Sequence, residues 1–193
     1  QYVIGLVFNL TRNICVSHSD IKNGLFDFER YESQDINKLS IGVIGTGSVG
    51  SAVCELANKL GMKIYANDIV INKNIINFTE YLPFNDVLRK SDIITLHIPY
   101  DKEFFYMISG KEFAMMKDGS YIINTCHPNL IDYIALYKAL LNKKLNGCAL
   151  DMIIEPNKDI FINNAPNYEE LIQYTIIKKL MEQDNVIITP RIS

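Results

Sequence analysis

The stretch LSIGVIGTGSVGSAVCELANKLGMKIYAND, residues 39–68, decides the fold of this chain. Three glycines within it, Gly45, Gly47 and Gly50, stand in G-x-G-x-x-G order directly after a short apolar run. Apolar residues then recur at helical spacing, and a second apolar run ends near Asp68, 18 positions after Gly50. The stretch therefore predicts a strand, a glycine turn, a helix and a second strand that ends on a carboxylate.

This order of elements is the context that the dinucleotide-binding fingerprint requires. Gly45 permits a tight turn, Gly47 lets the backbone approach a pyrophosphate, and Gly50 lets the helix lie close to the strand. The amino end of the helix offers N–H groups and the positive end of its dipole to that pyrophosphate. The glycines alone leave two alternatives open, a structural turn with no ligand and the cofactor loop of a methyltransferase.

Asp68 is placed to accept hydrogen bonds from an adenosine ribose, and its charge favours NAD over NADP. A carboxylate repels a 2′-phosphate, and residues 69–71 are Ile, Val and Ile, with no arginine to receive one. Lys73 is a nearby basic residue that argues weakly the other way. The stretch therefore predicts NAD as the cofactor.

Length, charge and cysteine content limit the class of protein. A chain of 193 residues suits one substantial domain and is too short for two full-sized ones. The net charge is −3 and the basic residues are scattered, which does not indicate a nucleic-acid or anionic-membrane surface. Apolar runs have strand length and no signal peptide is visible, so we expect no membrane partner. The four cysteines, Cys15, Cys54, Cys126 and Cys148, are widely spaced and form no C-x-x-C pair, which predicts four reduced thiols in a cytoplasmic protein. No cluster of cysteine and histidine has the spacing of metal ligands, so we expect no metal site.

The chain before the glycine stretch, residues 1–38, is expected to form a helical lead-in. Residues 2–16 follow a helical pattern with a single apolar stripe, made of Val3, Leu6, Val7, Leu10 and Ile14. Ser19 and Asp20 are candidate caps of a second short helix that runs to Phe28. A helix this apolar needs a partner surface, either the following domain or a second subunit, and we expect it at a dimer interface.

Residues 39–193 alternate strand and helix patterns, which predicts an α/β fold with a doubly wound, mainly parallel sheet. Buried strands are expected at 92–98 and 120–125, a short strand at 147–150 and a last strand at 185–189. Helices are expected from a cap at Asn85 to Arg89, over 109–116, from a cap at Asn129 or Asp132, and over 169–183. The pattern indicates a Rossmann-type NAD-binding domain, in which ligands bind at the carboxyl ends of the strands.

Chemically useful side chains follow several of these strands and should meet at that edge of the sheet. They are two histidines, one arginine and one carboxylate: His97, His127, Arg191 and Glu155. Hydride transfer with a hydroxy acid needs a cation for the substrate carboxylate, a proton acceptor for the hydroxyl group and a carboxylate that orients the acceptor. His97 ends a buried strand and is expected to be a structural histidine bonded to backbone, whereas His127 leaves its strand at the ligand edge.

A series of further motifs follows the glycine turn: SDIITLHIPY, MKDGSYIINT with NLIDYIAL, ALDMIIEP and NVIITP. With IGVIGTGSVG and the apolar helix that ends in Thr11 and Arg12, they resemble the nucleotide-binding domain of the D-2-hydroxyacid dehydrogenase family. The resemblance implies an NAD-dependent oxidoreductase of 2-hydroxy or 2-oxo acids that dimerises through this domain. It also implies NAD contacts at Ser48, Val49, Asp68, Pro99, Thr125, Cys126, His127, Asp151 and Arg191.

The chain departs from that family at two catalytic positions. Where the family has N-x-A-R-G, this chain has NTCHP, so His127 stands in place of the catalytic arginine. Where the family has T-P-H, this chain has TPR, so Arg191 stands in place of the proton-donating histidine. Glu155 is retained, in a segment one residue shorter than usual. Arg191 cannot be the acid–base group, because the pKa of a guanidinium is above about 12.

These departures lead to two hypotheses. In the first, the roles are exchanged: His127 handles the proton, Arg191 holds the substrate carboxylate, and Glu155 completes the catalytic set. In the second, the domain binds NAD(H) as a catalytically weak or inactive sensor or interaction module. Family members also build a substrate domain from a preceding segment and the tail. We expect neither in this chain, which by itself cannot close a cleft over a substrate.

Overall fold

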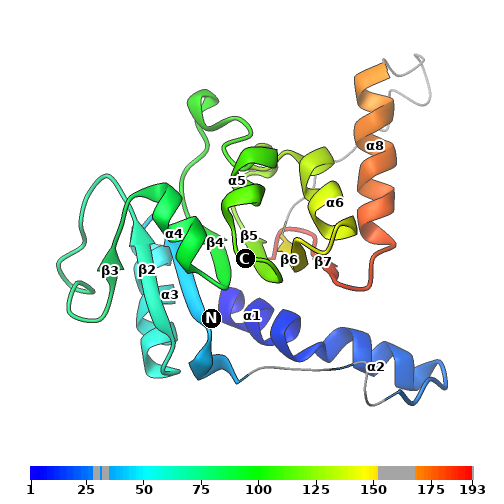
Figure 1. Ribbon diagram of the computed structural model, residues 1–193, viewed down its shortest axis with the longest axis horizontal. Helices are drawn as coiled ribbons and strands as arrows, with labels where there is room; N and C mark the ends of the chain where they lie inside the picture. Colours follow the sequence, from blue (N-terminus) through cyan, green and yellow to red (C-terminus); the bar gives the residue numbers. More distant parts are fainter. Residues whose placement is uncertain (28–30, 32–34, 152–167, 193) are drawn as a thin grey trace.

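The computed structural model describes residues 1–27, 31, 35–151 and 168–192. Its described strands form one seven-stranded sheet in the order β3-β2-β1-β4-β5-β6-β7, and every pair in it is parallel (Figure 1). The order reverses between β1 and β4, which confirms the doubly wound fold. The strands are β1 Ser40–Ile44, β2 Lys63–Asn67, β3 Glu80–Tyr81, β4 Ile93–Leu96, β5 Ser120–Asn124, β6 Leu145–Leu150 and β7 Val186–Ile188.

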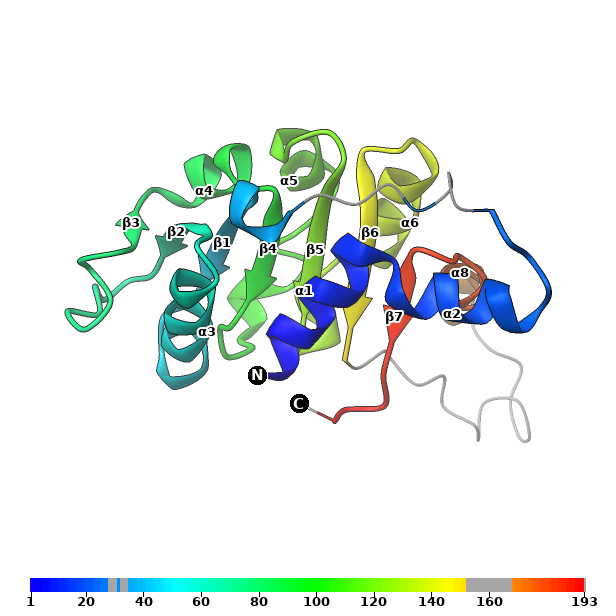
Figure 2. The ribbon, with the colours of Figure 1, turned by 90° about the horizontal axis from the view of Figure 1, so that it is seen from below.

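Helices cover both faces of the sheet (Figure 2). One buried cluster joins the sheet to α1 and α3, and a second joins its other face to α4, α5, α6 and α8. The bounds are α1 Tyr2–Arg12, α2 Ile14–Lys22, α3 Ser48–Lys59, α4 Phe84–Lys90, α5 Gly110–Met115, α6 Tyr133–Leu141 and α8 Tyr168–Met181. Three short 3₁₀ helices are η2 Ile36–Lys38, η3 Lys102–Phe104 and η4 Pro128–Leu130.

The first helix has its partner surface within the same chain. Val7 of α1 is fully buried in one cluster with Ile41 of β1 and Ile123 of β5. The predicted stripe breaks at Asn13, which adopts a left-handed conformation with φ 52° and separates α1 from α2. Ile14 therefore begins a new helix and is 52% exposed, so its place in the stripe was wrong. The start of α2 at Ile14 also corrects the expected caps near residue 20. Asparagine tolerates this left-handed backbone, and hydrophobic periodicity does not register it.

Three further elements refine the expected boundaries. Helix α4 begins before Asn85 with Pro83 as its N-cap, because the carbonyl of Pro83 accepts the N–H groups of Asp86 and Val87. Of the two candidate caps of α6, the structure selects Asp132, whose carboxylate accepts two first-turn N–H groups. Strand β3 was not predicted, because a pair of residues is too short to show an alternating pattern.

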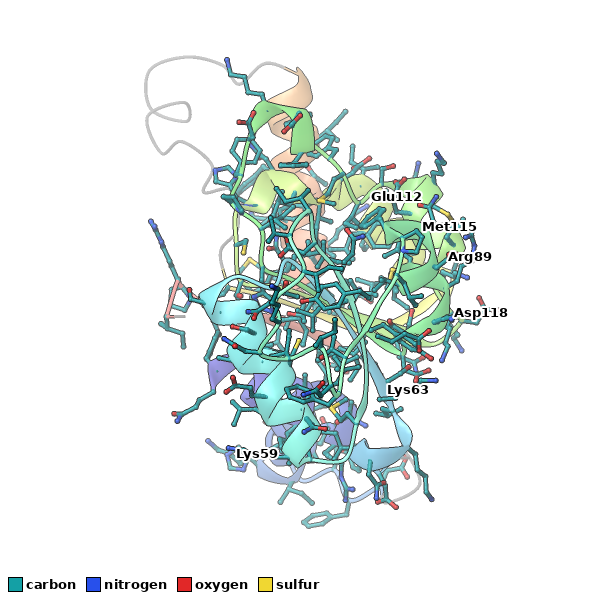
Figure 3. The ribbon with its side chains drawn as sticks, turned by 90° about the vertical axis from the view of Figure 1, so that its left-hand side faces the viewer. Lys59, Lys63, Arg89, Glu112, Met115 and Asp118 are labelled. Atoms are coloured by element: carbon teal, nitrogen blue, oxygen red, sulfur yellow. The ribbon has the colours of Figure 1, made fainter. Side chains whose placement is uncertain are left out.

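Polar and sulfur contacts tie the elements together away from the carboxyl ends of the strands. Arg89 of α4 and Met115 of α5 lie side by side (Figure 3), and the guanidinium donates to the thioether sulfur at 3.6 Å. Asp92, just before β4, accepts from the N–H and hydroxyl of Ser40 and from Lys117 Nζ at 2.7 Å. The contacts of Asp92 hold together the amino ends of β1, β4 and β5. The candidate site lies at the opposite edge of the sheet, at the carboxyl ends of the strands.

No helix in the described ranges is long and apolar enough to cross a membrane. Within the same ranges, no three histidine, cysteine or acidic side chains gather as a metal site would require.

Candidate active site

The glycine turn after β1 has the geometry expected for a pyrophosphate cradle. Gly45 has φ +91°, and a Cβ there would lie 2.5 Å from the carbonyl oxygen of His97. A Cβ on Gly50 would lie 1.9 Å from the carbonyl oxygen of Gly45, so only glycine lets α3 approach the strand this closely. A Cβ on Gly47 would meet no described atom within 4 Å, which leaves the space above it open to a ligand.

The amino end of α3 completes this cradle. Its N-cap, Gly47, provides no side-chain cap, so the first-turn N–H groups point outward without a side-chain acceptor. Ser48 and Val49 are exposed there, Val49 by 58%. Outward N–H groups together with the positive helix dipole bind phosphates. The residues present therefore fit the pyrophosphate of a dinucleotide.

Asp68, directly after β2, holds the glycine turn through hydrogen bonds. Its carboxylate accepts from the N–H and hydroxyl of Thr46 and from the N–H of Val70. Burial raises the pKa of Asp68, but these hydrogen bonds lower it by more, so the pKa lies below its usual value of 3.8 and the group is charged at neutral pH. Tyr81 of β3 donates to the hydroxyl of Thr46 at 3.0 Å. The sequence did not predict these hydrogen bonds, because the motif sets no residue preference at Thr46 and Tyr81 lies outside it.

A cavity of about 390 Å³ lies at the carboxyl ends of β4 to β7. Ile98 and Tyr100 line this cavity. The other lining residues are the six that were predicted for the site: Pro99, Thr125, Cys126, His127, Asp151 and Arg191. Four strand spacings separate β2 from β6, about 19 Å at about 4.8 Å per spacing. A dinucleotide with its ribose at Asp68 and its pyrophosphate on α3 therefore extends its nicotinamide end toward this cavity.

His127 is held at the cavity by two contacts. Its ring stacks on Tyr100 with centroids 4.1 Å apart and an interplanar angle of 18°. Its Nδ1 accepts the backbone N–H of Asn129 at 3.2 Å, which caps η4. We assign the tautomer from this bond: a neutral ring that accepts at Nδ1 carries its proton on Nε2 and donates from there. Tyr100 was not predicted to hold His127, because sequence spacing does not show a contact between two loops.

Cys126 and His97 have mainly structural contacts. The thiol of Cys126 donates to the carbonyl of Leu96 at 3.3 Å, and burial raises its pKa, so it is uncharged at neutral pH. His97 does not line the cavity; its Nε2 pairs with the hydroxyl of Thr95 at 2.9 Å. The expected backbone partner of the His97 ring was therefore wrong, since Thr95 of β4 and His97 directly after it are two residues apart in extended chain and lie on the same face. Burial lowers the pKa of His97 to about 4.

Asp151 lies at the end of β6 and is 1% exposed. One of its oxygens, Oδ1, accepts from the hydroxyls of Tyr2 and Thr189 at 3.0 and 2.6 Å and from the N–H of Ile192 at 3.0 Å. The N–H of Arg191 donates to the Asp151 carbonyl at 2.7 Å, and Arg191 has a left-handed φ of 52° that turns its exposed side chain out of the strand direction. Sequence reasoning missed Tyr2 and Thr189, because 149 and 38 residues separate them from Asp151.

The structure thus brings His127 and Arg191 to one cavity, beside the predicted cofactor contacts. Glu155, the third predicted catalytic residue, lies outside the described residues.

Fold and site together define a Rossmann-type domain for a dinucleotide, with a cavity at the carboxyl ends of β4 to β7. Residues 4–193 match the sequence model of the D-isomer specific 2-hydroxyacid dehydrogenase NAD binding domain, and the chain belongs to that family. It is an NAD-binding domain of the D-2-hydroxyacid dehydrogenases.

Named relatives agree with this placement. The chain is 33% identical to a D-specific alpha-keto acid dehydrogenase of Enterococcus faecium, over 98% of this chain and 57% of the relative. It is 34% identical to an aromatic 2-oxoacid reductase of Clostridium sporogenes, over 100% and 57%. The structure resembles D-lactate dehydrogenase from Aquifex aeolicus complexed with NAD and lactic acid, with a TM-score of 0.88, 31% identity, and coverage of 99% and 58%. The chain spans a little over half the length of these relatives.

Proposed function

We propose that the full-length protein transfers hydride between NAD(H) and a small 2-hydroxy or 2-oxo acid. The observation that carries this proposal is the cavity at the carboxyl ends of β4 to β7, which His127 and Arg191 line together with Asp151. NAD(H), when bound, supplies or accepts the hydride. The relatives named above act on 2-oxo acids according to their names, which favours an enzyme over a catalytically inactive NAD(H) sensor.

The two altered positions have complementary chemistry for a 2-oxo acid. The guanidinium of Arg191 is a permanent cation that can pair with the substrate carboxylate. His127 presents Nε2–H, a donor suited to the oxygen that is reduced or oxidised. Glu155 is the proposed carboxylate of the same set. These assignments keep the exchanged roles suggested by the sequence.

The bond from Asn129 decides how His127 can handle a proton. An imidazolium carries hydrogen on both nitrogens, so protonation places Nδ1–H against the N–H of Asn129 and breaks that bond. We therefore propose that His127 first acts as a hydrogen-bond donor that polarises the oxo group. Proton transfer through it requires a shift of the 127–129 loop.

The test is NADH oxidation by the full-length protein with pyruvate, glyoxylate, hydroxypyruvate and longer 2-oxo acids. We expect turnover with at least one, and a fall in kcat/KM of about 10–100-fold for His127→Phe, the value of one hydrogen bond to a charged group. Phenylalanine keeps the ring that stacks on Tyr100 and removes both nitrogens. His18→Gln, at an exposed position far along the chain from the site, is the control.

The opposite result has a defined meaning. NADH binding without turnover on any of these acids would favour the sensor or interaction module. The double substitution His127→Arg with Arg191→His restores the family pattern, and we expect it to damage activity. A large gain would show that the natural pair is a catalytic defect and not an exchange of roles.

We also propose that the protein is a cytoplasmic homodimer. The family resemblance implies the dimer, and an apolar surface on and after α2 supports it, with Ile14, Ile21, Leu25 and Phe26 all exposed. All four cysteines are free thiols, which suits a reducing compartment. Sedimentation of the wild type and of Phe26→Asp tests the interface: the variant should dissociate, and an unchanged dimer would place the interface elsewhere.

A further inference from the structure

The first turn of α1 contacts the nicotinamide end of the site through one hydroxyl group. Tyr2 donates to Asp151 Oδ1 at 3.0 Å and lies 2.5 Å from the hydroxyl oxygen of Thr189, which itself donates to the same carboxylate oxygen at 2.6 Å. The N–H of Ile192 adds a third donor at 3.0 Å. Two hydroxyls and one N–H, from α1 and from the segment after β7, therefore surround a single carboxylate oxygen, and the two hydroxyls also lie within hydrogen-bond distance of each other.

This convergence constrains a residue at the reactive end of the cavity. Asp151 lines that cavity, whereas Tyr2 does not. Asp151 is 1% exposed, so bulk water does not compete for its hydrogen bonds, and a donor to a buried carboxylate strongly restricts its orientation. The Tyr2 hydroxyl is thus hydrogen-bonded to Asp151, and Asp151 lines the space in which the nicotinamide is expected.

Attachment of α1 to the sheet does not depend on this hydroxyl. Val3, Leu6, Val7 and Leu10 are all buried on the sheet side of α1. This apolar contact is large compared with one hydrogen bond, and a phenylalanine at position 2 would keep the ring packing. A role in docking the helix therefore does not account for the convergence on Asp151.

We propose that Tyr2 is a positioning residue for nicotinamide binding, acting through Asp151. Its hydroxyl, with that of Thr189, fixes the carboxylate of Asp151 in the orientation that receives the nicotinamide end of NAD(H). The inference rests on the NAD contact proposed for Asp151 and does not depend on which acid is the substrate or on whether turnover occurs.

The test compares two ligands that differ at the nicotinamide. NADH and ADP-ribose share the adenosine and pyrophosphate that bind Asp68 and α3, but ADP-ribose lacks the nicotinamide ring. Calorimetric titration of the full-length protein measures both affinities. For Tyr2→Phe we expect NADH to bind about tenfold more weakly, which is about 1.4 kcal/mol, with ADP-ribose within about twofold of wild type.

A matched control and a second variant complete the design. Tyr121→Phe removes the hydroxyl of a tyrosine that packs against the same cluster as α1, and it should leave both affinities unchanged. Thr189→Val removes the second hydroxyl on Asp151 Oδ1 and should repeat the selective loss of NADH affinity. If Tyr2→Phe does not fold, Thr189→Val decides the outcome.

Two results would overturn the proposal: unchanged NADH affinity in Tyr2→Phe, or equal losses for NADH and ADP-ribose, which would indicate a general effect on the domain. Failure of the proposed catalytic function has a separate signature. In that case the wild type binds NADH but does not oxidise it with any 2-oxo acid. The test of Tyr2 still holds, because it compares only the affinities for NADH and ADP-ribose.

Discussion

Acidification should destabilise this domain through His97. The imidazole is buried at the end of β4, where burial lowers its pKa from 6.5 to about 4. Its Nδ1 has no hydrogen-bond partner among the described residues, so a proton added there gains no acceptor. The backbone carbonyl of the same residue packs against Gly45 of the cradle, which links the state of this histidine to the dinucleotide site.

The size of the effect follows from the two pKa values. The folded state favours the neutral ring, so the stabilising contribution is complete above the unfolded value of 6.5 and is lost as pH falls from 6.5 to about 4. A difference of about 2.5 pKa units at about 1.36 kcal/mol each gives about 3 kcal/mol. A loss of that size is a large share of the stability of a typical domain.

Urea unfolding of the wild type and of His97→Gln across this pH range measures the effect. Glutamine is neutral throughout and can still bond the hydroxyl of Thr95. All residues other than position 97 are shared by the two proteins, so the difference between them isolates His97. The wild-type advantage should therefore shrink by about 3 kcal/mol between neutral pH and about 4. A constant difference, or an NMR titration midpoint for His97 near 6.5, would refute the reasoning.

Other substitutions test the cradle and the opposite edge of the sheet. Gly50→Ala should cost about 1–3 kcal/mol in urea unfolding, because its Cβ would lie 1.9 Å from a carbonyl oxygen of the same turn. Gly47→Ala is its control: it should keep wild-type stability yet bind NADH more weakly in calorimetry, and equal stability losses in the two variants would contradict the assignment. Asp92→Asn should cost about 1–3 kcal/mol at neutral pH by the same unfolding assay. Burial raises the pKa of Asp92, but the hydrogen bond from Lys117 and its neighbours lower it by more, so this contribution is lost as pH falls below 3.8. An unchanged acid profile in Asp92→Asn would exclude this role.

Local sequence signals predicted the strand, the glycine turn and the helix that surround the proposed adenosine and pyrophosphate positions. The glycine turn, the helix after it and Asp68 lie within one short stretch, and each has a residue preference that follows from backbone geometry. The same holds for Asp132, a helix cap whose acceptor bonds join neighbouring residues. Where a structural role depends on a few consecutive residues, the sequence contained enough information to assign it.

At the carboxyl ends of β4 to β7, the sequence predicted which residues lie together but not which contacts they make. Parallel topology placed His127, Asp151 and Arg191 at one edge, and the structure brings them to one cavity. The hydroxyl of Tyr2 and the ring of Tyr100 were missed, since each acts on a residue from another element and leaves no periodic or motif signal. The break at Asn13 was missed for a different reason: a single left-handed residue does not alter the spacing of apolar side chains.

The two ends of the dinucleotide site also differ in when a growing chain can assemble them. The bond between Thr46 and Asp68 closes a loop of 22 residues, whereas the contact between Tyr2 and Thr189 joins residues 187 apart. Short loops close at a lower entropy cost, and synthesis proceeds from the amino terminus. All residues of the cradle for adenosine and pyrophosphate are therefore present in the growing chain once β2 has been made. The hydrogen bonds that hold Asp151 must wait until Thr189 has been made, so they close the longest loop of the site and carry its largest entropy cost.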